Sequence, residues 1–274
     1  MAENVETHHM RLEAHEMRPD PHQTRPENDD NRQEGRKVRV AAIGDIHVRE
    51  NDTGKWSDFF KEASRQADVL VIVGDLTDTG DEGEAMVLVN ELKSCTIPVI
   101  AVLGNHDYEK GRHKLIRSTL QKADVQVLDG EAIVVHGIGF AGVKGFGGGF
   151  DRHLLSMFGE GAMKAFVQEA VDEALHLERA LSRLDQEHNV EKKIALMHYA
   201  PIKDTVVGEP EQIFPFLGCS RLAEPLSRHK VLAAFHGHAH VGTLEGQTQD
   251  GIPVYNVAKP ILNKRELPFF IFEA

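Results

Sequence analysis

Past its polar N-terminal segment, the chain alternates short apolar runs, rich in β-branched residues, with longer segments in which apolar positions follow helical spacing. Three of the apolar runs end abruptly at a glycine and a polar residue, and they predict buried strands over residues 38–45, 68–75 and 97–107. Residues 56–67 and 82–94, which lie between them, predict helices. Strands and helices that alternate at this spacing indicate βαβ units, and therefore an α/β domain with a mostly parallel sheet.

The second half of the chain continues this pattern with longer elements. Helices are predicted over residues 161–187 and near 220–228, and strands over residues 192–198, 230–238, 251–258 and 267–274.

A glycine-rich segment, KGFGGGFDRH (144–153), interrupts the pattern. It lacks the GxxxxGK[ST] spacing of a phosphate-binding loop. Because long irregular loops in compact domains tend to be functional, we interpret it as a mobile loop or lid near a site rather than an inert linker. Its candidate substrate contacts are Lys144, Phe146, Phe150 and Arg152.

A change in composition near residue 37 divides the chain. Residues 1–36 are rich in Glu, Asp, Arg, His, Pro and Asn and poor in aliphatic residues, so they predict a flexible tail that cannot bury enough apolar area to order itself. Residues 37–274 predict a single folded domain. The whole chain, with 41% hydrophobic and 27% charged residues, has the composition of a globular protein.

The formal net charge of −12 argues against a broad nucleic-acid-binding surface, because such surfaces neutralise phosphates with Lys and Arg. A small phosphorylated substrate is compatible with it, since a bound metal supplies positive charge locally. No apolar run has the length of a membrane span, and the acidic start does not resemble a secretory signal. Cys95 and Cys219 lack the spacing of a thiolate zinc site. We therefore expect a cytoplasmic protein without membrane or nucleic-acid partners.

Polar side chains with metal-binding chemistry directly follow the predicted strands. In open α/β sheets the carboxyl ends of parallel strands line one crevice, so residues far apart in sequence come together there. The residues that follow five predicted strands in this way are Asp45, His47, Asp75, Asn105, His106, His198, His238 and His240. Turn chemistry alone does not explain such residues at five strand ends, and they predict one shared site.

All of these residues except His106 are candidate metal ligands. Imidazole and carboxylate without thiolate suit Mn, Fe, Zn, Co or Ni better than Ca or Mg. The candidates outnumber the roughly three protein ligands of a mononuclear catalytic site. They therefore predict two divalent ions that share a carboxylate. Ions roughly 3.5–4 Å apart generate a hydroxide nucleophile and stabilise an in-line displacement at phosphorus.

The motifs at these strand ends are GDIH (44–47), GDLTD (74–78), GNHD (104–107), His198 and GHAH (237–240). Each is weak alone, because Gly-Asp and Gly-Asn are common turn dipeptides. Together, in this order, they resemble the five motifs of the calcineurin-like metallophosphoesterase superfamily, and the resemblance spans most of the domain.

The resemblance implies a four-layer α/β/β/α sandwich, in which helices flank two central mixed sheets. It also implies that Asp75 bridges two ions, with the ligands divided as Asp45, His47, Asp75 and His240 on one ion and Asp75, Asn105, His198 and His238 on the other. By the same resemblance, a metal-bridging hydroxide attacks phosphorus directly, while His106 faces the phosphate and acts as general acid or as a hydrogen-bond donor to the transition state. Asp107 is expected to orient the His106 ring and hold its proton.

The expected function is hydrolysis of a small phosphodiester or phosphomonoester, nucleotides included. A protein Ser/Thr phosphatase, a nuclease with the same site and a non-catalytic metal-binding scaffold stay open as alternatives, as do the native metal and the oligomeric state. His236 falls outside the Gly-His-x-His pattern and is predicted to end a strand or to support a ligand. Asp78 is predicted to cap its loop rather than to act in catalysis.

Overall fold

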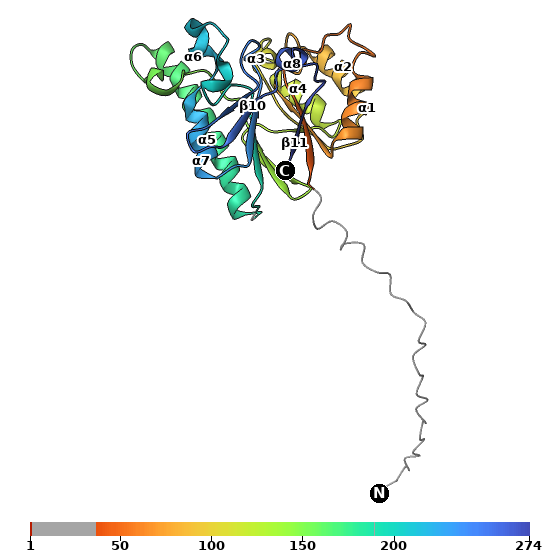
Figure 1. The fold of residues 1–274 in the computed structure, drawn as a ribbon. Coiled ribbons are helices and arrows are strands. Elements are labelled where there is room, and N and C mark those ends of the chain that lie inside the picture. Colours follow the sequence, from red (N-terminus) through yellow and green to blue (C-terminus); the bar gives the residue numbers. More distant parts are fainter. Residues whose placement is uncertain (2–36, 189) are drawn as a thin grey trace. The chain divides into compact units, whose positions relative to one another are not determined.

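The computed structural model of the protein describes Met1, residues 37–188 and residues 190–274. The tail predicted over residues 1–36 therefore lies almost wholly outside the described residues and stays a prediction. In Lys37–Ala274, two β-sheets lie face to face and helices cover their outer faces (Figure 1).

The first sheet has five strands in the order β11-β1-β2-β3-β4. They are β1 (Arg39–Ile43), β2 (Val69–Val73), β3 (Val99–Val102), β4 (Gln126–Val127) and β11 (Phe270–Glu273). β1 to β4 run parallel, and β11 is antiparallel to β1. β2 and β3 are buried at every position, as expected for parallel strands that are covered on both faces.

The second sheet has six strands in the order β5-β6-β7-β8-β10-β9. They are β5 (Glu131–Val135), β6 (Ile138–Gly142), β7 (Lys193–Leu196), β8 (Ala233–His236), β9 (Glu245–Gln247) and β10 (Pro253–Asn256). The inner strands β6, β7, β8 and β10 are parallel, and β5 and β9 are antiparallel edges.

The longer helices form the two outer layers. α1 (Ser57–Gln66), α2 (Glu82–Leu92) and α4 (His113–Gln121) belong to the layer over the first sheet, and α5 (Gly161–Gln186) and α7 (Ala223–Arg228) to the layer over the second (Figure 1). The short helices α3 (Asn105–Tyr108) and α8 (Lys259–Asn263) follow the ends of β3 and β10, and α6 (Phe214–Leu217) lies in the connection between β7 and β8. Among the described helices, none combines the length and apolar character needed to cross a membrane.

The side-chain alternation of the second sheet divides the core in two. In β6, Ile138 and Phe140 belong to the apolar cluster that lies between the sheets. The intervening position Ala141 belongs instead to the cluster that includes Leu177 and Leu181 of α5. Because successive residues of a strand face opposite sides, this sheet is apolar on both faces and is buried between two layers.

The predicted fold class is confirmed: two mixed sheets are flanked by helices. The predicted strands are longer than the observed ones, because the Gly-polar residues at their ends leave the ladder and form the turns. The hairpin of β5 and β6 and the helix α4 were not predicted. No polar residue of the site follows β5 or β6 as it follows the predicted strands, whereas α4 does have an amphipathic pattern, with Ile116 and Leu120 buried on one face.

The glycine-rich segment 144–153 begins as a packed connection, and the expectation that it is a mobile loop or lid near the site stays a prediction. Lys144 and Phe150 are 6% and 3% exposed. The Gly148 N–H donates a hydrogen bond of 2.7 Å to the carbonyl oxygen of Pro215. Lys144 is therefore buried and paired with Glu169 and Glu173 rather than available as the substrate contact that we expected. Phe150 and Arg152 line a cavity beside this loop, and with Phe146 they stay predicted contacts.

Candidate metal centre

The turns that follow five strands meet at one edge of the two sheets. Asp45 and His47 come after β1, Asp75 after β2 and Asn105 after β3, all in the first sheet. The second sheet contributes His198 after β7, and His238 and His240 after β8. The crevice predicted at a single sheet edge is thus built from both sheets.

Four of the predicted ligands have backbone angles that side-chain-bearing residues seldom adopt. The φ angles are 57° for Asp45, 44° for His47, 49° for Asp75 and 67° for His238. A left-handed conformation costs a non-glycine residue of the order of 1 kcal/mol, and it persists where the surrounding structure enforces it. These turns aim each side chain across the crevice rather than along the strand.

The glycines of the motifs permit close approach between the turns. A Cβ atom on Gly104 would overlap the backbone nitrogen and the carboxylate of Asp75. A Cβ atom on Gly237 would overlap the carboxylate of Asp45. Glycine is therefore required at both positions for a steric reason, because a buried carboxylate of a neighbouring turn lies directly against each glycine.

The Asp75 carboxylate lies at the middle of the cluster. Its Oδ1 is 3.4 Å from Nε2 of His198, and its Oδ2 is 3.6 Å from Nε2 of His47. Oδ1 also accepts a hydrogen bond of 2.9 Å from the backbone N–H of His106. The two oxygens therefore face imidazoles on opposite sides, as a ligand shared between two ions requires.

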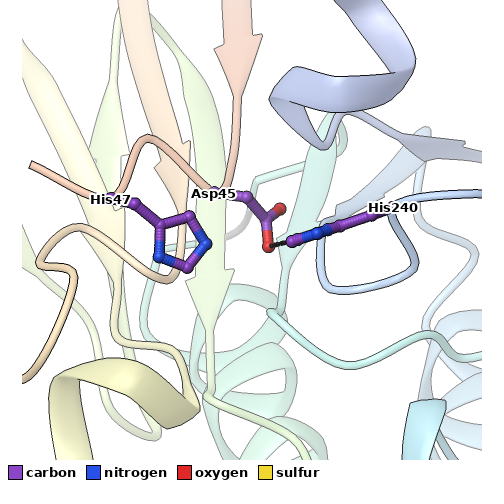
Figure 2. A group of neighbouring side chains, drawn as sticks. All are labelled: Asp45, His47 and His240. Carbon is purple, nitrogen blue, oxygen red and sulfur yellow. Dashed lines mark hydrogen bonds and ion pairs between the residues drawn. The ribbon is translucent and has the colours of Figure 1, made fainter.

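Asp45 connects the two histidines of the GHAH motif. Nε2 of His240 is 2.9 Å from Oδ1 of Asp45, and the backbone N–H of His238 is 3.1 Å from both carboxylate oxygens. Figure 2 shows the Asp45 carboxylate between the rings of His47 and His240. The ring centroids of these two histidines are 5.9 Å apart.

Hydrogen bonds fix the rings of His198 and His238. Nδ1 of His198 donates to the carbonyl oxygen of Val73 at 3.0 Å, which leaves Nε2 facing Oδ1 of Asn105 at 2.9 Å. Nε2 of His238 donates to the carbonyl oxygen of Phe216 at 3.1 Å, which leaves Nδ1 as its lone-pair nitrogen. Such backbone partners orient metal-ligating imidazoles in general.

The donor atoms are close enough to hold ions together. The groups Asp45–His47–His240, His47–Asp75–His106 and Asp75–His198–His238 each have donor atoms within 4.8 Å of one another. Asn105 joins the last group through His198. The structure thus brings every predicted ligand into one cluster.

The electrostatics of the cluster favour a cation. Asp45 and Asp75 are 2% and 1% exposed. Burial disfavours a charged ring at His198, yet the Asp75 carboxylate, with Asp45, raises the pKa of His198 to about 9. Burial likewise disfavours a charged Asp75, yet His198 holds the pKa of Asp75 well below its usual range. A divalent ion supplies the positive charge that these buried carboxylates require, so the residues fit a metal.

The remaining imidazoles of the cluster differ in their environment. Burial, and then the neighbouring His198, lower the pKa of His238 to about 4, and burial lowers the pKa of His47. The hydrogen bond to Asp45 raises the pKa of His240. Nδ1 of His47 is buried and makes no hydrogen bond within the described residues. His47 and His238 are therefore held as neutral rings, the form in which imidazole binds a metal.

His106 lies beside Asp75 and is partly open to solvent, with 38% of its side chain exposed. Its Nδ1 donates to the carbonyl oxygen of Asp78 at 2.6 Å. Its Nε2 is therefore the ring atom free for a ligand, and it lies 4.0 Å from Oδ2 of Asp75. Asp78 thus positions His106 through its backbone, a role that the sequence did not indicate.

The expectation that Asp107 orients the His106 ring is not met. Asp107 is fully buried, and its carboxylate accepts hydrogen bonds from the backbone N–H groups of Leu76, Thr77 and Gly104 and from the Thr77 hydroxyl. Burial and the nearby Asp75 raise the pKa of Asp107 to about 6 in spite of these bonds. Asp107 connects the turn after β2 with the turn after β3, because its carboxylate accepts hydrogen bonds from backbone N–H groups of both turns.

His236 is not a ligand, as predicted. It ends β8, is fully buried, and uses both ring nitrogens: Nδ1 contacts the Gly237 carbonyl oxygen at 2.8 Å and Nε2 the Thr205 hydroxyl at 2.7 Å. Burial lowers its pKa to about 4. His236 therefore stabilises the GHAH turn through its contacts with Gly237 and Thr205.

Fold and site together define a metal-binding protein of the α/β/β/α class. The family model for calcineurin-like phosphoesterases matches residues 38–242, and the chain belongs to this family. The resemblance inferred from the motifs is thereby confirmed.

Solved structures show the same fold at low sequence identity. TT1561 of Thermus thermophilus is 16% identical with a TM-score of 0.53, over 87% of this chain and 98% of that one. GAP50, described as the anchor in the inner membrane complex of Plasmodium, is 13% identical with a TM-score of 0.51, over 82% and 72%. A Staphylococcus aureus protein provisionally described as a 5′-nucleotidase is 15% identical with a TM-score of 0.51, over 80% and 48%. Comparison with curated proteins finds no match.

Proposed function

We propose that the protein is a dinuclear metal-dependent hydrolase of small phosphoesters, nucleotides included. The observation that carries the proposal is the position of Asp75, whose two oxygens face His47 on one side and His198 on the other. Membership of the calcineurin-like phosphoesterase family supports the reaction class.

The proposed ligands divide between the two sides of Asp75. One set is Asp45, His47, Asp75 and His240, and the other is Asp75, Asn105, His198 and His238. Bound divalent ions of the Mn, Fe, Zn, Co or Ni type would neutralise phosphate oxygens and activate water at neutral pH.

His106 is proposed to supply the proton for the leaving group. Its Nδ1–H is committed to the Asp78 carbonyl oxygen, so only Nε2 is available for the substrate. When the ring is protonated, Nε2–H donates to the leaving oxygen and the proton moves from Nε2 to the departing alkoxide. Such general acid catalysis contributes about 10²–10⁴-fold to a rate.

Two alternatives are distinguishable from this proposal. A processive nuclease is disfavoured by the net charge of −12, because nucleic-acid binding requires a basic surface. A non-catalytic scaffold is suggested by GAP50, which is described as an anchor. Against the scaffold, every predicted ligand position in this chain carries a donor, and His106 faces the crevice with a free ring nitrogen.

The test is hydrolysis of p-nitrophenyl phosphate and bis(p-nitrophenyl) phosphate by the metal-depleted full chain, with and without added Mn²⁺. We expect release of p-nitrophenol that depends on the metal, and the ratio of the two rates reports a monoester or diester preference. Stoichiometric metal binding without hydrolysis of either ester, or of a panel of nucleotides, would support the scaffold and refute the enzyme.

A further inference from the structure

A cavity of about 670 Å³ borders the candidate metal centre at Asp45 and His47. It lies between the turn after β1, the start of α1 and the helix α8, and its polar and aromatic lining consists of Asp45, His47, Arg49, Asp52, Lys55, Trp56, Phe59, Lys259 and Asn263. Asp45 and His47 belong both to the candidate metal centre and to the wall of this cavity, so a molecule held at the metal centre would lie next to the cavity.

The cations of the cavity differ in what they contact. Arg49 is paired with Asp78, at 2.9 Å between Nε and Oδ2, and Lys55 is paired with Asp52. Nζ of Lys259 makes no hydrogen bond or ion pair within the described part of the chain. Among the described residues, Lys259 is thus the cation of this cavity that has no paired carboxylate; Asp52, which is paired with Lys55, acts on its charge only from a distance.

The position of Lys259 is nonetheless defined. Its Nζ lies 4.2 Å from the centroid of the Trp56 ring, a cation–π contact, and Trp56 is itself only 7% exposed. Burial lowers the pKa of Lys259. An ammonium group has three N–H donors, and here they lie over the Trp56 ring with no acceptor among the described residues. An anionic ligand would supply acceptors and replace the water that half-burial removes.

We propose that this cavity binds a second oxyanion of the substrate through Lys259, so that the preferred substrates are small phosphoesters that carry a further phosphate or a carboxylate. The inference rests on the proposed function for the placement of the reacting phosphate at the metal centre. It explains how a chain with a net charge of −12 selects a multiply charged substrate: the unpaired positive charge lies within the site.

Trp56 provides a direct signal, because it is the single tryptophan of the chain and lies under Lys259. The metal-loaded full chain is titrated with alkyl phosphonates, which are not hydrolysed, and the fluorescence is followed on excitation at about 295 nm, where tryptophan dominates. The probes share linkers of three to six carbons and end in a methyl group, a carboxylate or a second phosphonate. We expect the doubly anionic probes to bind about tenfold to a hundredfold more tightly than the methyl-terminated ones.

Three variants test whether Lys259 causes the preference for doubly anionic probes. Lys259→Met should remove it and Lys259→Arg should retain most of it, since the charge is kept. Lys61→Met is the matched control, because this lysine lies on the exposed side of α1, is paired with Asp58 and does not line the cavity. A thermal melt of each variant shows whether it is folded. Equal affinities for all probes in the native protein, or an unchanged preference in Lys259→Met, overturn the proposal.

Comparison of the carboxylate-terminated probes with the bisphosphonate probes shows which kind of second anion the cavity prefers. Hydrolysis assays then test the class of substrate. Adenosine 3′,5′-bisphosphate is compared with adenosine 5′-monophosphate, and 3-phosphoglycerate with glycerol 3-phosphate, as ratios of kcat/KM. We expect Lys259→Met to lower at least one of these ratios about tenfold or more, and Lys61→Met to leave both unchanged. If no phosphoester is hydrolysed while the probe preference persists, the proposed function fails and the anion site stands.

Discussion

The two sides of the candidate metal centre differ in how far the protein encloses them. We call the side of Asn105, His198 and His238 the closed half, and the side of Asp45, His47 and His240 the open half; Asp75 belongs to both. The difference lies in the histidines: the side chain of His198 is 0% exposed and His238 is partly buried, whereas the side chains of His47 and His240 are 20% and 42% exposed, although Asp45 of the open half is itself buried. Backbone carbonyls orient the rings of the closed half, and the open half borders the cavity of Lys259.

This difference in exposure suggests that the two halves of the cluster have different functions. A preorganised, dehydrated set of donors binds an ion tightly and exchanges it slowly, while an exposed set admits water and substrate. We therefore expect the closed half to hold its ion permanently and the open half to hold the exchangeable ion next to the substrate.

The largest effect is expected from Asp75→Asn, because Asp75 belongs to both halves. The substitution removes a negative charge from between the two sets of ligands, so both metals should bind weakly and turnover should fall by about a thousandfold or more. Metal content after gel filtration and kcat/KM with p-nitrophenyl phosphate measure the two effects.

Asp58→Asn is the matched control for this change, since the Asp58 side chain is 96% exposed and, among the described residues, is paired with Lys61 alone. It should leave metal content and turnover unchanged. Two tightly bound ions in Asp75→Asn would contradict the shared position of Asp75 and, with it, the distinction between two halves.

His106→Ala should separate chemistry from metal binding. The His106 ring packs edge-on against the ring of His47, at 4.5 Å between centroids, and lies 4.0 Å from Asp75, but it is not one of the proposed ligands. Both ions should therefore remain, while kcat falls by about 10²–10⁴-fold through loss of the proton donor. Its effect should be smaller for a p-nitrophenolate leaving group, which needs little protonation, than for an alkyl phosphate.

A histidine outside the centre provides the comparison for His106. His136→Asn changes an exposed ring at a left-handed position that asparagine also tolerates, and it should leave turnover unaltered. Full alkyl phosphate turnover in His106→Ala would remove His106 from the mechanism.

His198→Ala tests the closed half by itself. The ring is fully buried with both nitrogens engaged, so its loss leaves a cavity and unpaired groups, and we expect about 2–4 kcal/mol of destabilisation together with loss of one ion. Urea unfolding of the metal-depleted protein isolates the structural part. A stability equal to that of the native chain would show that the closed half is not preorganised by packing.

Asp107→Ala tests the support beneath the closed half. Its carboxylate accepts hydrogen bonds from Leu76, Thr77 and Gly104, which flank the ligands Asp75 and Asn105. Truncation leaves those buried donors without an acceptor, and we expect about 1–3 kcal/mol of destabilisation in urea. The opposite result, native stability with altered pH dependence of kcat, would restore the role in orienting His106 that the sequence suggested.

The features that the sequence predicted, strands and candidate ligands, are those that depend on the type and order of residues along the chain. Apolar runs and the polar residues at their ends located β1, β2, β3, β7 and β8, and every predicted ligand lies in the cluster that follows them. The assignment of individual ions to the two sets stays a prediction.

What the sequence did not predict depends on three-dimensional neighbours. Asp107 and Asp75 both follow apolar strands, and only the backbone donors around Asp107 show that its carboxylate is used within the protein. The role of the Asp78 carbonyl in holding His106 has no side-chain signature at all. Lys259 is an ordinary lysine in the sequence, and its significance comes from a tryptophan 203 positions earlier in the chain.

His240→Ala should have the smallest effect on the fold and therefore tests the open half most directly. Its side chain is 42% exposed and its one hydrogen bond within the described residues goes to Asp45, so metal-depleted protein should unfold at nearly the native urea concentration. We expect affinity for one ion to fall at least about tenfold, while the ion of the closed half stays bound through gel filtration. Raising Mn²⁺ should then restore much of the turnover, which it should not do in His198→Ala. Equal loss of both ions in the two variants would show that the halves bind metal as one cooperative unit, and that the difference in exposure does not set the order of binding.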